Sequence, residues 1–406
     1  MLNKEQFYQS MLGRCSIILY GLFIIFFDAF ATCFVWHKSQ EKQRKRLLLV
    51  RMDAIGDFIL WQPAAVALRE LYPAEHWDIT LAANQSWVIL AQQAGLFDQV
   101  FPIHYSQLHR NLIYRFKVLR WLGAQGFDVS INPVYSRELL CGDALIRASK
   151  AKQKIGWQGD RSNLHPWLKK MTDTWYNQLI RNTSVFQTEL KRNADFISAL
   201  GGGNAFQQPV LKIKHESSTV LPDKPYFVLF PGASWQGKQW SVTNFSELAF
   251  KIIKQTGWQL VICGGHADIE VGVALRKSCF PAALCLVGKT ELDELANIIA
   301  HAQLLVSNDT GAAHIGAAVG TDTVCIAGGG HFGRFVPYDT ELKMEHMRVV
   351  NQAMSCYGCN WQCIYPRDAA LPVPCIAEIS VNQVWQVVEG IIQKPAAKVK
   401  AGCPQT

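Results

Sequence analysis

The sequence lacks several features that would assign it to common classes of nucleotide-binding protein. No two aspartates are separated by a single residue, which argues against a transferase that holds its nucleotide through a metal ion on such a pair. The turn at residues 51–57 lacks the three glycines of a dinucleotide-binding loop, which argues against a nicotinamide or flavin enzyme. The chain has no long basic helix and no aromatic-rich RNA-binding motif, so we expect no nucleic-acid partner.

Charged residues are also few, at 18% of the chain, while 49% of the 406 residues are hydrophobic. This length and composition can build the cores of two globular domains. The formal net charge of +8 suits a phosphate-bearing ligand or an anionic membrane surface. The 12 cysteines are not spaced like the framework of a small secreted domain, so a reducing cytoplasm is the expected setting.

One long apolar run, Cys15–Trp36, lies near the N-terminus. As a helix it would extend roughly 33 Å, enough to span a bilayer. One narrow stripe of that helix would carry Arg14, Gly21, Asp28 and Thr32. A charged Asp28 at mid-depth disfavours a spanning helix, and the stripe instead suits a helix at a membrane surface or one packed on the protein body.

A basic cluster follows the apolar run, formed by Lys38, Lys42, Arg44, Lys45 and Arg46. Such clusters stay on the cytoplasmic side and attract anionic headgroups. We therefore interpret residues 1–46 as a membrane-associating extension at the cytoplasmic face of the bacterial inner membrane. A spanning helix, a cleaved signal peptide and a soluble packing helix are the alternatives. Because the globular pattern begins only at Leu47, removal of residues 1–36 is expected to leave a folded protein.

From Arg46 onward, apolar strands alternate with helices. The expected strands of a first array are 47–50, 78–82, 100–101 and 128–132. A polar, proline-bearing linker near 205–224 follows. The expected strands of a second array are 226–230, 259–263, 284–287, 304–306 and 323–326. Two such arrays predict an α/β fold of two doubly wound parallel sheets, with domains at 47–210 and 225–393 and a tail at 394–406. Ligands of such sheets bind at the carboxyl ends of the strands, so we expect the site in a cleft between the domains.

The block Ser307–His314 joins a buried strand to a helix rich in small residues. Asp309, Thr310 and Gly311 therefore lie at a strand-to-helix turn, where exposed N–H groups and the helix dipole favour an anion. Thr310 offers a hydroxyl, and Gly311 lets a ligand approach the backbone. An ordinary helix cap followed by a core helix is the alternative interpretation.

Three other expected strands end in residues suited to binding or catalysis. Asp57 follows the first strand and is either a helix cap or a general base. A glycine-bearing turn precedes Ser234 and Lys238, whose hydroxyl and ammonium suit a phosphate. Glu270 follows Gly264-Gly265 and is either a ribose contact or an exposed residue of the first helical turn.

A late group of cysteines is spaced locally like zinc ligands and consists of Cys356, Cys359, Cys363 and Cys375. The segment between the last two carries three prolines, which indicates a loop. A structural metal, free thiols and an incidental disulfide all remain open for this group.

Together these turns resemble glycosyltransferase family 9, whose best-known members are the ADP-heptose:lipopolysaccharide heptosyltransferases. The matching segments are 48–65, 230–240, 263–270 and 286–320, within a resemblance that covers roughly residues 47–393. Two departures stand out: 46 residues precede the first strand, and the glycine-rich segment Gly328–Arg334 and the cysteine-bearing tail are not those of the standard lipopolysaccharide-core enzymes.

The resemblance implies a GT-B fold and an inverting transfer that needs no metal in the chemical step and no other cofactor. Carried over by position, Asp57 is the base that deprotonates the acceptor. Donor contacts are implied at Ser234, Lys238, Glu270, Asp309, Thr310, Gly311 and His314.

The expected function is the transfer of a sugar, heptose in the best-known members, from a nucleotide-diphosphate donor. The expected acceptor is a hydroxyl of a lipopolysaccharide or other glycolipid or polysaccharide precursor at the membrane surface. A nucleotide-sugar epimerase or hydrolase and a non-catalytic membrane-bound binding protein are the alternatives.

Overall fold

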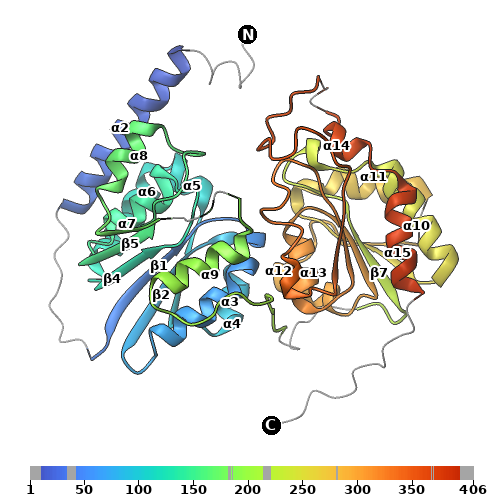
Figure 1. Cartoon of the computed structure of the whole chain (residues 1–406), viewed down its shortest axis with the longest axis horizontal. Helices are drawn as coiled ribbons and strands as arrows, with labels where there is room; N and C mark the ends of the chain where they lie inside the picture. The colour runs from blue at the N-terminus through green and yellow to red at the C-terminus, as the bar shows by residue number, and fades with distance from the viewer. Residues whose placement is uncertain are drawn as a thin grey trace. The chain divides into compact units, whose positions relative to one another are not determined.

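The computed structural model describes residues 11–33, 43–181, 184, 186–213, 221–279, 282–366, 368 and 370–393. The predicted tail and part of the predicted basic cluster lie outside these residues. The chain divides into two compact units. Unit 1 comprises Met1–Phe58, Ala64–Val185 and Asn193–Ala205, and unit 2 comprises Ile59–Pro63, Phe186–Arg192 and Phe206–Thr406. Within each unit, helices lie on both faces of one six-stranded sheet (Figure 1).

The sheet of unit 1 is parallel, with strand order β3-β2-β1-β4-β5-β6. Its strands are β1 (Lys45–Arg51), β2 (Trp77–Asn84), β3 (Gln99–Ile103), β4 (Val129–Asn132), β5 (Gln153–Trp157) and β6 (Gln178–Ile180). Continuous apolar runs form the central strands because both faces of a parallel sheet are covered. The strand order reverses between β1 and β4, and ligands of such folds bind at the carboxyl ends of the strands at that point.

The sheet of unit 2 is also parallel and repeats the same topology, with strand order β12-β11-β10-β7-β8-β9. Its strands are β7 (Tyr226–Phe230), β8 (Gln259–Ile262), β9 (Leu284–Cys285), β10 (Leu304–Asn308), β11 (Thr323–Ile326) and β12 (Met347–Val350). Here the order reverses between β7 and β10, so the corresponding ligand position lies after Phe230 and Asn308.

The α-helices of the first part of the chain are α2 (Met11–Cys33), α3 (Ile55–Leu71), α4 (Val88–Ala94), α5 (Tyr105–Arg110), α6 (Leu112–Ala124), α7 (Ala144–Ala148), α8 (Pro166–Asp173) and α9 (Glu189–Ala199). Those that follow are α10 (Val242–Thr256), α11 (Ile269–Cys279), α12 (Leu292–Ala300), α13 (Gly311–Val319), α14 (Pro374–Ala377) and α15 (Val381–Ile392). Local signals set their ends: the Ser241 hydroxyl accepts the Asn244 N–H at the start of α10, and left-handed Gly257 ends it.

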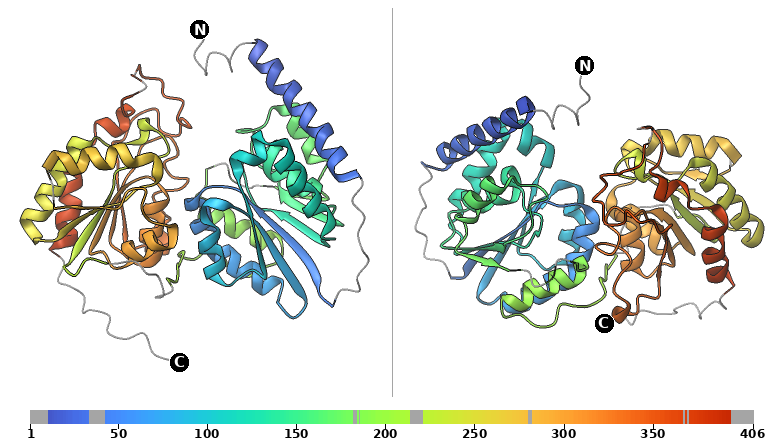
Figure 2. Two further views of the ribbon diagram at one scale, coloured as in Figure 1. Left: turned by 180° about the vertical axis from the view of Figure 1, so that it is seen from behind. Right: turned by 45° about the horizontal axis from the view of Figure 1, so that its top comes forward.

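Helix α2 lies along the outside of unit 1, against α6 and α7 (Figure 2). Its buried stripe contains Gly21, Ile24, Asp28 and Ala31. The Asp28 carboxylate forms a bidentate ion pair with the Arg115 guanidinium of α6, with both N–O distances 2.6 Å. Gly21 and Asp28 of the polar stripe predicted from the sequence thus face the protein. Among the helices of the described residues, none combines the length and the hydrophobicity that a membrane span needs.

Several elements differ from the sequence-based expectations. Strands β5, β6 and β12 and helix α8 were not predicted. In β5, Gly156 interrupts the apolar strand pattern, and the structure requires glycine there because an added Cβ would come within 2.6 Å of Tyr176. Residues 108–122 have helical periodicity in the sequence, but they belong to two helices, because the Asn111 side chain accepts the Tyr114 N–H and starts α6 as a separate helix.

Candidate active-site residues at the strand ends

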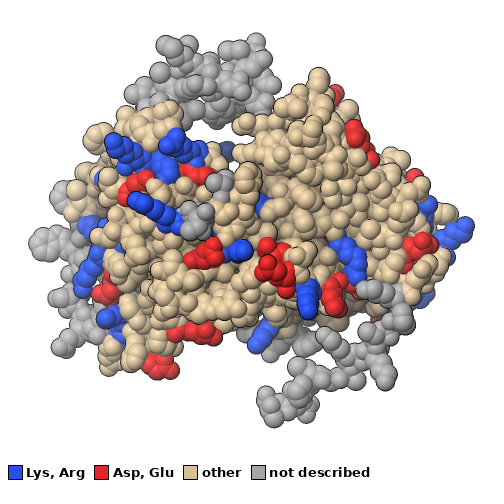
Figure 3. All heavy atoms as spheres, viewed as in Figure 1, with Lys and Arg blue, Asp and Glu red and all other residues tan. Residues whose placement is uncertain are grey.

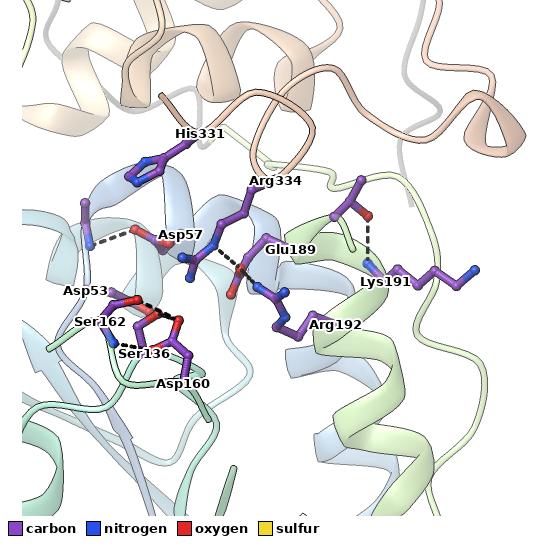
Figure 4. A network of polar contacts seen from close by, with 12 residues as sticks. Asp53, Asp57, Ser136, Asp160, Ser162, Glu189, Lys191, Arg192, His331 and Arg334 are labelled. Atoms are coloured by element: carbon purple, nitrogen blue, oxygen red, sulfur yellow. Dashed lines mark hydrogen bonds and ion pairs between the residues drawn. The ribbon is translucent and has the colours of Figure 1, made fainter. Parts of the chain in front are cut away.

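In unit 1, the turn between β1 and α3 carries the predicted base Asp57. Asp57 is half-buried in the first turn of α3, and its Oδ2 accepts the N–H of Ala54, the N-cap residue, at 3.2 Å (Figure 4). The capping contact considered from the sequence is therefore present. A capping carboxylate with this partial exposure still has a second oxygen that could accept a proton, so the cap does not decide between the two interpretations.

The same turn is held by several contacts that fix the position of α3. The Asp53 carboxylate pairs with the buried Arg51 guanidinium, and the Asp53 carbonyl accepts the Trp87 indole N–H at 2.9 Å. The Trp87 ring stacks on Phe58, with centroids 4.3 Å apart. These contacts hold the turn that carries Asp57.

A pocket opens at the point where the strand order of unit 1 reverses. It is lined by Val50, Met52, Asp53, Asn132, Val134, Ser136, Glu138, Cys141 and Gly142. Near it the Asp160 carboxylate accepts the hydroxyls of Ser136, at 3.0 Å, and Ser162, at 2.9 Å (Figure 4). Hydroxyl, amide and carboxylate groups in one pocket are suited to binding the hydroxyls of a sugar.

In unit 2, Asn308 connects the ends of the two central strands. Its Nδ2 donates to the carbonyls of Pro231, at 2.7 Å, and Gly232, at 3.2 Å, and its Oδ1 accepts the Trp240 N–H at 3.1 Å. Thr310 is the N-cap residue of α13, and its hydroxyl lies 3.1 Å from that of Ser307. The backbone N–H groups at Gly311 therefore begin a nine-residue helix at the strand end, where an anion is favoured.

Lys238 and Asp309 meet at this strand end. Lys238 Nζ lies 3.4 Å from Asp309 Oδ2, and each side chain is 13% exposed. Lys238 Nζ also lies 4.7 Å from the centroid of the Trp361 ring. The ammonium of Lys238 is thus held beside the N-terminus of α13, where it can balance the charge of a bound phosphate.

Ser234 and Glu270 are both exposed near the carboxyl edge of the sheet of unit 2. Neighbouring Asp268 is 8% exposed, accepts the Gly265 N–H at 2.8 Å, and lies so close to Gly232 that an added Cβ there would come within 2.1 Å of the carboxylate carbon. Burial raises the pKa of Asp268. Asp268, which the sequence did not single out, therefore caps the turn before Glu270 and lies against Gly232 in the turn that carries Ser234.

His314 is buried in α13, with 3% of its surface exposed. Its Nδ1 lies 2.6 Å from the Tyr338 hydroxyl. Burial lowers the pKa of His314 to about 4, so the imidazole is neutral at pH 7. This residue supports α13 from within the protein, whereas Thr310 and Gly311 are partly exposed.

The glycine-rich segment after β11 contributes residues that the sequence did not assign to the site. The Trp361 indole N–H donates to His331 Nδ1 at 3.2 Å, so His331 Nε2 carries the hydrogen that faces Asn360 Oδ1 at 2.5 Å. Nearby Glu189 Oε2 pairs with Arg334 Nε at 3.1 Å and with Arg192 (Figure 4). The missed signal was a run of glycines directly after a strand, the same signal that marked the other strand ends.

Charged side chains of both signs are interspersed on the described surface seen in Figure 3. The two parallel six-stranded sheets, each with helices on both faces, have the GT-B fold seen in heptosyltransferase structures. The chain belongs to glycosyltransferase family 9 (heptosyltransferase), whose family model matches residues 115–363.

Individual relatives agree with this assignment. Lipooligosaccharide heptosyltransferase 2 of Haemophilus influenzae is 32% identical over 300 residues, covering 70% of this chain and 83% of the relative. A crystal structure of the family 9 glycosyltransferase of Veillonella parvula matches with TM-score 0.67 and 20% identity over 88% of this chain and 99% of that one. The structure of Escherichia coli heptosyltransferase WaaC with ADP-2-deoxy-2-fluoro heptose matches with TM-score 0.64 and 18% identity, and the match covers 85% of this chain and 99% of that one. These two structures share the fold.

Proposed function

We propose that this protein transfers heptose, or a closely related sugar, from an ADP-linked donor to a hydroxyl of a lipopolysaccharide precursor. Family membership supports the class of reaction, and the names of its relatives support the donor and acceptor. The observation that carries the proposal is the Lys238–Asp309 pair beside the N-terminus of α13. That turn offers a cation, backbone N–H groups and a hydroxyl to one diphosphate.

In the proposed mechanism, Asp57 accepts the proton of the acceptor hydroxyl while its oxygen attacks the anomeric carbon. The bond from that carbon to the donor phosphate oxygen breaks in the same step, and the nucleoside diphosphate leaves with the electron pair. A single displacement inverts the anomeric configuration. Lys238 and the N–H groups at Gly311 stabilise the charge that develops on the leaving group, so no metal is needed in this step.

The remaining predicted residues have supporting roles in this proposal. Ser234 and Thr310 donate hydroxyl hydrogen bonds to the diphosphate, and Glu270 accepts those of the ribose. Asp309 holds Lys238 in place before the donor binds and then faces sugar hydroxyls. His314 acts indirectly, because its buried contact with Tyr338 fixes the helix that carries Thr310 and Gly311.

The test is transfer by the purified protein from ADP-heptose to heptose-deficient lipopolysaccharide, followed by mass spectrometry of the glycolipid. The expected product is heavier by one sugar residue, with inverted anomeric configuration by NMR. Free sugar or an epimerised donor in the absence of acceptor would favour an epimerase or hydrolase. Donor binding without turnover on any envelope acceptor would favour a non-catalytic binding protein.

We also propose that α2 holds the enzyme at an anionic membrane surface while remaining packed on unit 1. Its outer face exposes Tyr20, Phe23, Phe26 and Phe30, with 44–74% of each side chain accessible. Arg120 lies over the ring of Phe116, which itself packs on Phe27 of α2, so a cation borders the apolar face. An aromatic face beside basic groups is suited to the interface of a lipid bilayer.

The packing of α2 changes the expected result of deleting residues 1–36. The deletion would remove Asp28 and leave the guanidinium of Arg115, 1% exposed, without its counter-ion, which destabilises a protein strongly. Substitutions on the outer face are therefore the better test of membrane binding.

The triple variant Phe23→Ser, Phe26→Ser, Phe30→Ser should sediment with phosphatidylglycerol-containing vesicles at least about tenfold less than the parent, because burial of aromatic side chains drives interfacial binding. The matched control is Phe250→Ser, which replaces a 60% exposed phenylalanine of α10 in unit 2. Equal sedimentation of parent and triple variant would remove α2 from membrane binding.

A further inference from the structure

Four cysteines of unit 2 line one small cavity. Cys356, Cys359 and Cys363 belong to the loop after β12, and Cys375 belongs to α14. All four are free thiols. Cysteines brought to one cavity from two separate segments are arranged unlike isolated buried thiols, which serve only as small apolar side chains.

The backbone around this cavity is tightly specified. Gly358, Asn360 and Trp361 all have left-handed backbone angles, with φ of 83°, 50° and 61°. The Gly358 N–H donates to the Gly329 carbonyl at 2.8 Å, and the Asn360 N–H donates to the Gly330 carbonyl at 3.0 Å. Two consecutive non-glycine residues in this conformation carry a steric cost that the surrounding structure must offset.

Aromatic side chains of this loop pack directly against the backbone of the glycines after β11, where no larger residue would fit. A Cβ on Gly329 would lie 2.2 Å from the Tyr357 ring, and one on Gly330 would lie 2.3 Å from the Trp361 ring. The Gly329 N–H also donates to Cys375 Sγ at 3.3 Å. Backbone N–H groups that donate to sulfur are typical of the surroundings of metal-bound thiolates, because they stabilise the negative sulfur.

We propose that Cys356, Cys359, Cys363 and Cys375 bind one tetrahedral metal ion, zinc or iron. The spacing of two residues and then three residues between the first ligands, with a fourth cysteine from a second segment, suits a four-thiolate site. The ion would stabilise residues 351–373, a long segment without a regular helix or strand among its described residues.

Ion binding requires the four sulfur atoms to move closer together. No three side chains of His, Cys, Asp or Glu in the described part of the chain are already placed to hold an ion. Thiolate–zinc bonds are about 2.3 Å long, and rotation about χ1 moves a cysteine sulfur between staggered positions at little cost. The backbone that carries the four cysteines and the cavity that they share are already formed before an ion binds.

The proposed ion would also order a residue beside the donor site. Trp361 lies between Cys359 and Cys363, its ring lies beneath the Lys238 ammonium, and it packs against Trp235 with centroids 5.9 Å apart. This second consequence rests on the proposed role of Lys238 in donor binding. The metal site itself does not, so the two can fail separately.

The first experiment measures metal by plasma mass spectrometry in the full-length protein, purified without chelators under reducing, oxygen-free conditions. About one ion per chain is expected, as for structural thiolate sites. An absorbance band from thiolate-to-metal charge transfer identifies iron, and its absence with bound metal identifies zinc. Cys359→Ser and Cys363→Ser should lose the ion while Cys285→Ser, which changes a partly buried thiol of β9, keeps it.

Metal below about a tenth of an ion per chain in the folded parent would overturn the site. So would a disulfide between any two of the four cysteines, detected by mass spectrometry of the alkylated protein. For the second consequence, ADP should bind about two- to fivefold more weakly by calorimetry after a mercurial reagent releases the ion, in the range of one lost cation–π contact. Unchanged ADP affinity would separate Trp361 from the donor site.

Discussion

The two sheets of this protein share one topology but end in opposite chemistry. At the reversal point of unit 1 the strand ends carry carboxylates, Asp53 and Asp57, and the nearby Arg51 is already paired. At the reversal point of unit 2 they carry glycine, hydroxyl groups and Lys238, which pairs with the one carboxylate there that the sequence singled out, Asp309. An acidic edge can accept a proton but repels a diphosphate, whereas an edge with N–H groups and an ammonium binds one. The shared fold supplies equivalent positions, and a few side chains divide the chemistry between them.

Asp57 and Asp309, one acidic residue from each of these strand ends, are also held differently. Asp57 accepts a hydrogen bond from the backbone of its own helix, and Asp309 pairs with the side chain of Lys238. A backbone contact leaves Asp57 in place whatever binds nearby. An ion pair between partly exposed side chains can exchange partners, so a diphosphate can compete with Asp309 for the ammonium.

Loss of the base at the acidic edge should have the largest effect. Asp57→Asn should lower kcat about 10²- to 10⁴-fold with donor affinity unchanged, because the amide cannot take the acceptor proton. Initial rates of transfer and calorimetric titration with ADP measure the two quantities. The matched control is Glu294→Gln, which alters a carboxylate that caps the N-terminus of α12 in the same way, with Glu291 N to Glu294 Oε2 at 2.9 Å. Full activity of the Asp57 variant would make Asp53 the next candidate.

Removal of the cation at the carboxyl edge of the unit 2 sheet, here called the second edge, should have the next largest effect. Lys238→Ala should weaken ADP binding about 10- to 100-fold and adenosine binding little, because a charge-assisted hydrogen bond to phosphate is lost. Titration calorimetry with both ligands checks this. Lys251→Ala is the control, since Lys251 also lies over a tryptophan ring, Trp385, at 5.9 Å in the same unit. If both lysine variants bind ADP like the parent, the second edge is not the diphosphate site.

Protonation of His314 beneath the second edge should destabilise unit 2 at acid pH. The pKa of this buried imidazole is lowered to about 4, against an ordinary value near 6.5, so the unfolded state takes up the proton first as the pH falls. The stability that the neutral imidazole contributes is full above about pH 6.5 and is lost progressively toward pH 4, about 2 kcal/mol of it by pH 5.

Urea unfolding of the parent and of His314→Gln at pH 7.5 and pH 5.0 measures this difference. The parent should lose more stability than the variant between the two values, because only the parent has a group there that takes up the proton. Equal losses would show that His314 keeps an ordinary pKa.

Divalent cations should have the smallest effect, less than about twofold in kcat, because Lys238 and the N-terminus of α13 supply the positive charge at the leaving group. Initial rates in brief EDTA treatment and in added magnesium or manganese check this. Activity that is abolished by EDTA and restored by magnesium would show that a metal ion is needed to bind the donor diphosphate or to stabilise its charge.

The strand-to-helix turn between β10 and α13 was predictable because its signals are local. A buried strand followed by Asp309, Thr310 and Gly311 fixes a strand-to-helix turn wherever it occurs, and the structure starts α13 at Gly311. Edge strand β6 was not predictable in this way, because three residues carry too little periodicity. The role of Gly328–Gly330 was also hidden, since the rings that require those glycines lie in a loop that begins more than 20 residues later.

The sequence by itself determined the alternation of strands and helices, the polar turns at the strand ends and the family, because each depends on residues close together in the chain. Only the tertiary structure decided that Asp28 pairs with Arg115, 87 residues away, so that the polar stripe of α2 faces inward and its aromatic face outward. It likewise decided that His314 is buried against Tyr338 and that four cysteines line one cavity. The physical reason is that desolvation and charge pairing depend on which distant elements pack together, and local sequence patterns do not determine that packing.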